Sequence, residues 1–169
     1  MTKFGCSVTN LYMLLSSYGI NNTPIGSPAN PGAVGIPGLN GADLTPGTLN
    51  SAMANYRTNF ITNGSVGFDQ NNDPIWAGAA EVARAGYRSQ CTTTAGCNPN
   101  DAISKVSYKH QLPSFADEET AIAGIQNEIC SGNPVILKFG KSGGGQHFML
   151  ATGIVWDSDN RVQTLRLNN

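Results

Sequence analysis

The sequence predicts an α+β fold, with helices in the first two thirds of the chain and strands in the last third. Before residue 130, apolar residues recur at helical spacing in several segments, whereas after Asn133 the pattern becomes that of extended chain. Helices followed by strands, rather than alternating with them, are typical of α+β folds. The 169 residues, 40% of them hydrophobic, suit one buried core, so we expect a single domain over residues 1–169.

The first predicted helix runs from Cys6 to Tyr18 and ends at Gly19. Residues 20–44 contain four prolines among many glycines, which break helical and strand patterns, and we expect a long surface loop there. A second helix is predicted to begin at Thr45-Pro46, because threonine is a good N-cap and proline fits the first helical position. Its apolar face comprises Leu49, Ala52, Met53 and Tyr56.

Two more helices are predicted, at about residues 75–85 and 115–130. The last of them should point Ile122, Ile125 and Ile129 inward and end at Ser131-Gly132. Extended segments follow over residues 134–139, 147–156 and 162–167, and we expect them to form an antiparallel sheet.

Composition excludes several classes of partner. The formal net charge is -1, so no basic surface for nucleic acid is expected. No apolar run approaches the roughly 20 residues that a membrane-spanning helix needs, and the N-terminus lacks the pattern of a signal peptide. Only 12% of the residues are charged, which favours a secreted or extracytoplasmic protein.

The four cysteines are Cys6, Cys91, Cys97 and Cys130, and their spacing fits no zinc-binding pattern. Cys91 and Cys97 flank a short polar loop that a disulfide would close, with a stabilisation of about 2 kcal/mol. Such a bond would indicate an oxidising compartment. The alternative is a pair of free thiols.

Cys6 and His147 are the strongest candidates for catalytic residues. Cys6 opens the first helix, where unpaired backbone N–H groups and the positive end of the helix dipole favour a thiolate. Its own N–H is placed to stabilise an oxyanion. His147 follows a glycine-rich turn at the start of a strand. A cysteine and a histidine far apart in sequence are typical of thiol hydrolases, although a structural cysteine and a core histidine are the alternatives.

Three segments stand out in order along the chain, at residues 4–20, at residues 45–50, and at residues 132–137 with 146–153. Together they resemble the bacteriocin-processing type of peptidases, double-glycine leader peptidase-like members of the papain-like cysteine peptidases. Residues 4–20 resemble the segment that carries the nucleophile, and residues 45–50 a Thr-Pro-Gly helix start. Residues 132–137 and 146–153 are similar to the strand pair that presents the histidine. The resemblance implies a papain-like fold, with Cys6 as nucleophile and His147 as base.

In that family, the third catalytic residue is an Asp or Asn at the end of the next strand. Asn169 matches that position better than Asn168. A change of strand register by one residue would exchange the faces of the sheet on which these two asparagines lie. The family also has a Gln several residues before the cysteine, and only Met1 to Gly5 precede Cys6. We therefore expect a sequence truncated at both ends, with additional domains outside it.

The resemblance implies a hydrolase that cuts peptide or protein substrates through an acyl-enzyme, with no metal or organic cofactor. Two alternatives stay open. One is a thiol amidase or transferase on the same fold, because an acyl-enzyme can be resolved by water or by an amine. The other is a catalytically inactive binding or adhesion module that keeps the fold.

Overall fold

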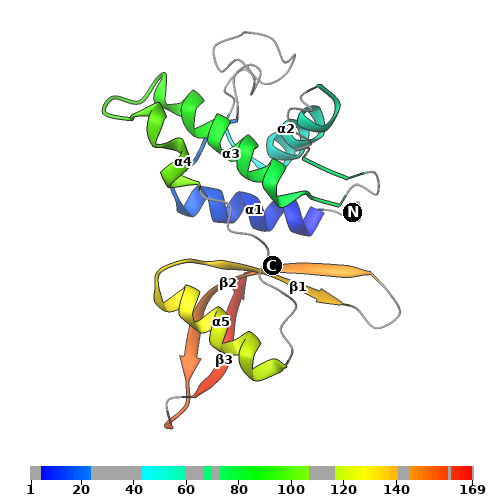
Figure 1. Ribbon diagram of the computed structural model, residues 1–169, viewed down its shortest axis with the longest axis vertical. Helices are drawn as coiled ribbons and strands as arrows, with labels where there is room; N and C mark the ends of the chain where they lie inside the picture. Colours follow the sequence, from blue (N-terminus) through cyan, green and yellow to red (C-terminus); the bar gives the residue numbers. More distant parts are fainter. Residues whose placement is uncertain are drawn as a thin grey trace. The chain divides into compact units, whose positions relative to one another are not determined.

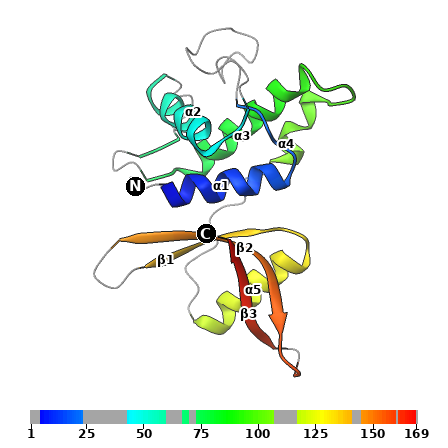
Figure 2. The ribbon, with the colours of Figure 1, turned by 180° about the vertical axis from the view of Figure 1, so that it is seen from behind.

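The computed structural model describes residues 5–23, 43–59, 67–69, 73–106, 117–140, 145–159 and 161–168. It divides into two compact units, Met1–Tyr108 and Lys109–Asn169. In its described residues the first unit is helical, and the second contains an antiparallel sheet and one helix (Figures 1 and 2). The expected α+β class is therefore confirmed.

The first unit contains the helices α1 (Gly5–Ser17), α2 (Pro46–Asn59), α3 (Trp76–Cys91) and α4 (Ala102–Lys105), with a 3-10 turn η1 (Pro99–Asp101) before α4. In this unit α1 packs against α2, α2 against α3, and α3 against η1 and α4. The three long helices each contribute apolar side chains to the buried core, namely Val8, Leu11, Leu15, Leu49, Ala52, Met53, Ala79, Val82 and Ala83.

The first two helices agree with their predicted bounds. Gly19 follows α1 with a φ of 73°, a conformation that glycine adopts without strain. At the start of α2, the Thr45 hydroxyl accepts a hydrogen bond from the N–H of Thr48 over 3.1 Å, which confirms the predicted cap. The third helix was predicted too short, since α3 continues to Cys91. The short η1 and α4 were not predicted.

The ends of the segment 20–44 correct the prediction of a surface loop. Ile20, Thr23 and Leu44 are buried, with at most 7% of their surface exposed. The N–H of Leu44 donates to the carbonyl oxygen of Asn21 over 2.6 Å, so the two ends of the segment are paired. Residues 24–42 lie outside the described part of the chain.

The side chain of Gln90 on α3 holds the chain that leaves α1. Its amide nitrogen donates to the carbonyl oxygen of Gly19, and its amide oxygen accepts from the N–H of Asn21, both over 2.9 Å. On the same helix, Gly86 faces the backbone of Asn22: a Cβ at Gly86 would lie 2.4 Å from the Asn22 carbonyl oxygen. These contacts hold the residues that follow α1 against α3.

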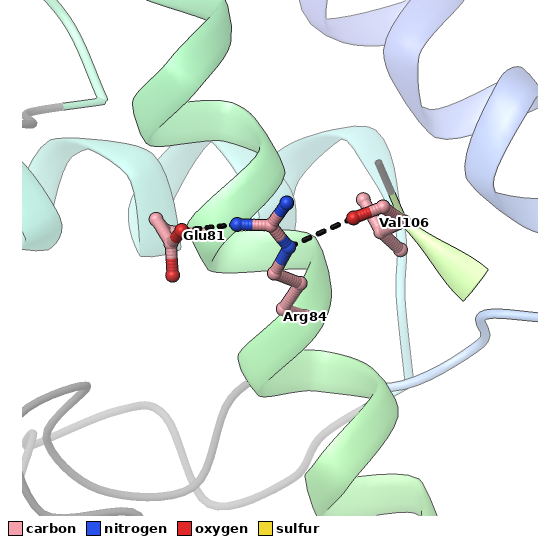
Figure 3. Close-up of polar contacts among 3 residues, drawn as sticks. All are labelled: Glu81, Arg84 and Val106. Carbon is pink, nitrogen blue, oxygen red and sulfur yellow. Dashed lines mark hydrogen bonds and ion pairs between the residues drawn. The ribbon is translucent and has the colours of Figure 1, made fainter. Parts of the chain in front are cut away.

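Arg84 links α3 to the end of α4 (Figure 3). Its Nε donates to the carbonyl oxygen of Val106 over 2.8 Å, and its guanidinium also pairs with the Glu81 carboxylate on the same helix. Val106 directly follows α4, so this contact helps to hold the short helix in place.

The second unit contains α5 (Glu118–Cys130) and the strands β1 (Val135–Gly140), β2 (Gln146–Trp156) and β3 (Val162–Asn168). The strands form an antiparallel sheet in the order β1-β2-β3, and α5 packs against β1 and β2 (Figure 1). Asp117 caps α5, and Ser131 and Gly132 follow its last residue as predicted. Of the three isoleucines expected to point inward, Ile125 is buried and Ile122 and Ile129 are half-buried.

Cys91 and Cys97 form a disulfide, which confirms the prediction made from their spacing. Cys6 and Cys130 are free thiols. In the residues that the structure describes, no helix is both long enough and apolar enough to cross a membrane.

Candidate active site

Cys6 is the second residue of α1, in the first unit, and it is half-buried. The first turn of α1 contains no acidic residue. Nothing in that turn therefore offsets the positive end of the helix dipole, which favours a negative charge beside it.

Asn10 lies one helical turn after Cys6 and is only 1% exposed. Its side-chain Nδ2 donates a hydrogen bond to the carbonyl oxygen of Cys6 over 2.7 Å. In a regular helix this carbonyl accepts the backbone N–H four residues later, so the side chain supplies an additional donor to it. The turn that carries Cys6 is thus tied to a buried amide. Sequence reasoning missed this contact.

His147 is the second residue of β2, in the second unit, and it is half-buried. It lies opposite Phe139 of β1 in the antiparallel register. Successive residues of a strand point to opposite faces, so His147 shares its face with Met149 and not with Phe148 or Leu150. The two latter residues are buried, at 8% and 2% exposed.

The register between β2 and β3 places Asn168 opposite Leu150 and Leu167 opposite Ala151. Cross-strand partners lie on the same face, and Leu150 is three residues from His147. The Asn168 side chain therefore lies on the face opposite to that of His147. Asn169, the preferred third catalytic residue, lies outside the described residues.

The described part of the chain thus holds a free cysteine at the start of a helix and a half-buried histidine on an antiparallel strand. A thiol that can ionise and an imidazole that can exchange a proton are the groups of a thiol-dependent hydrolase. Cys6 belongs to the first unit and His147 to the second.

Comparison with known protein families identifies the class of protein to which this chain belongs. The family model described as Peptidase_C39 like family matches residues 1–165, which is almost the whole chain. The chain belongs to this family, and the resemblance seen in its three segments is confirmed. No curated protein and no solved structure matches it. Membership of this family supports assignment as a peptidase, and the family implies peptides or proteins as the class of substrate.

Proposed function

We propose that this protein is a papain-like cysteine peptidase in which Cys6 is the nucleophile, His147 the general base and Asn169 the residue that orients the imidazole. The match to a peptidase family over residues 1–165 carries the proposal. It spans both units, so we treat them as parts of one peptidase domain. The position of Cys6 at the N-terminus of α1 supports the choice of nucleophile.

The reaction follows from these groups. His147 takes the proton of the Cys6 thiol, and the thiolate adds to the carbonyl carbon of the scissile peptide bond. The backbone N–H of Cys6 stabilises the oxyanion. The imidazolium then protonates the leaving amine as the C–N bond breaks, which leaves a thioester on Cys6. Water attacks the thioester, its proton passes to His147, and the acid product and the free thiol are released.

Asn169 is preferred to Asn168 because of strand geometry. Asn168 shares its face with Leu150, whereas His147 lies on the other face. This placement argues against Asn168, so Asn169, which the resemblance already favoured and which lies outside the described residues, is kept as the proposed partner of the imidazole. The single variants Asn169→Ala and Asn168→Ala form a matched pair. We expect a large loss of kcat only in the first, and equal losses would argue against this choice.

An extracytoplasmic location forms part of the proposal. The disulfide between Cys91 and Cys97 supports it, because such bonds persist in oxidising compartments. The low content of charged residues, 12%, is in keeping with it.

Labelling by iodoacetamide directly tests whether His147 activates the Cys6 thiol. The folded, non-reduced protein is labelled between pH 5 and 9 and read by peptide mass spectrometry. Cys130 is free and exposed, and serves as an internal control. We expect Cys6 to label rapidly below pH 7, and more slowly in His147→Ala. Slow labelling of Cys6 that does not depend on His147 would favour the inactive binding module.

A cleavage assay then separates the reaction types. A peptide library derived from a proteome digest is incubated with the wild type and with Cys6→Ser. New peptide ends that depend on Cys6 would support a peptidase. Products that contain an added amine, such as glycinamide supplied in excess, would favour a transferase. Cleavage that is unchanged in Cys6→Ser would overturn the proposal.

A further inference from the structure

Phe139 is an exposed aromatic residue beside the candidate base. It lies directly opposite His147 in the register of β1 and β2. Cross-strand partners have Cβ atoms about 4.5–5.5 Å apart and share one face of the sheet. Phe139 is nevertheless 39% exposed. A large apolar ring therefore retains free surface next to the imidazole.

The other neighbours of His147 on this face are apolar as well. Leu137 is two residues before Phe139 on β1, and Met149 is two residues after His147 on β2, so both share its face. Lys138, the only charged residue of β1, lies on the opposite face. The described neighbours of the imidazole within the sheet thus offer no charge to a polar ligand.

We propose that Phe139 is a specificity-determining residue: it binds an apolar side chain of the peptide substrate beside the scissile bond. This inference rests on the proposed function. A general base must come within about 3 Å of the group whose proton it transfers. A side chain that flanks the scissile bond then lies within reach of a residue about 5 Å from the base. Ligand sites favour this combination of an apolar wall and a few polar groups.

Trp156 provides a matched control. It is a large aromatic residue of the same sheet and is 39% exposed, the same fraction as Phe139. It is the last residue of β2, nine positions after His147, and lies opposite Val162. Because strands rise about 3.3 Å per residue, the two positions are separated by up to roughly 30 Å along β2. The two aromatic side chains are equally exposed, and Trp156, unlike Phe139, is far from His147 along the strand.

The test compares cleavage profiles from the peptide library for the wild type, Phe139→Leu, Phe139→Ala and Phe139→Lys, with Trp156→Ala and Trp156→Lys as controls. Thermal melting verifies that each variant is folded. For the wild type we expect Leu, Ile, Met or Phe at one position beside the cut, preferred about tenfold or more over Ser. Phe139→Leu should keep this preference, and Phe139→Ala should lose most of it.

Phe139→Lys gives the sharpest readout. We expect it to shift the preference at the same position towards Asp and Glu, which a purely structural role would not produce. The profiles of both Trp156 variants should equal that of the wild type. Active Phe139→Ala and Phe139→Lys variants with unchanged profiles would overturn this inference and leave the proposed peptidase standing. Absence of any cleavage dependent on Cys6 in the wild type would overturn both.

Discussion

The Nδ2 of Asn10 donates a hydrogen bond to the backbone carbonyl oxygen of Cys6, over 2.7 Å and across one turn of α1. Asn10 is 1% exposed and Cys6 is half-buried, so this contact is partly shielded from water. A hydrogen bond is electrostatically stronger in the low local dielectric of the protein interior than in water, so this bond is worth more than an equivalent one at the surface. It joins the core of the helical unit to the turn that carries the candidate nucleophile.

Asn10→Ala should therefore lower the free energy of unfolding by about 1–3 kcal/mol. Ser17→Ala is the matched control, since the exposed Ser17 hydroxyl makes the same kind of contact, to the carbonyl oxygen of Leu14 over 2.7 Å. Its effect should stay within about 0.5 kcal/mol. Urea denaturation measures both. Equal effects would show that burial of Asn10 does not strengthen the contact.

Gly86→Ala should destabilise the protein, although alanine is the better helix former by about 1 kcal/mol. The added methyl group would lie 2.4 Å from the carbonyl oxygen of Asn22, so the backbone there must move. We expect a net loss of about 1–3 kcal/mol by chemical denaturation. Gly47→Ala in α2 is the control, because its Cβ would meet only Thr45 Oγ1 at 3.8 Å. A stabilised Gly86→Ala variant would contradict the close contact.

Removal of the disulfide with the double variant Cys91→Ser and Cys97→Ser should cost about 2 kcal/mol, because the unfolded chain is no longer constrained. Thermal or urea unfolding under non-reducing conditions measures the loss. The wild type unfolded with reductant should match the variant. Cys130→Ser should have little effect, since Cys130 is exposed and unbridged. A variant as stable as the oxidised wild type would contradict this expectation.

We expect Asp117 to make the free energy of unfolding depend on pH. The hydrogen bond from the N–H of Thr120, 2.7 Å long, holds the pKa of the Asp117 carboxyl below its usual range. Such a group stabilises the fold above its unfolded pKa, about 3.9, and the contribution is lost as the pH falls through the lower folded pKa. The stability difference between the wild type and Asp117→Asn should thus be constant from pH 7 to about 5 and shrink below about 4. A difference that persists unchanged at pH 2 would exclude this linkage.

Local patterns were sufficient to predict most of the secondary structure. The bounds of α1, α2 and the three strands follow from spacing, caps and turn residues, which act within a few positions of the chain. The end of α3 was missed because Gly86 weakens the helical pattern. In the structure Gly86 packs against Asn22, a contact between segments 64 residues apart that no local pattern reveals.

By itself the sequence determined the family, the order of helices and strands, the disulfide, and Cys6 and His147 as the candidate catalytic pair. Only the tertiary structure decided which residues surround Cys6 and which surround His147. The register of the strands assigned Phe139 to the face of His147 and Asn168 to the other, and helix packing buried Asn10 beneath Cys6. The physical reason is that composition and periodicity are properties of neighbouring residues, whereas faces and burial depend on pairing between segments distant in sequence.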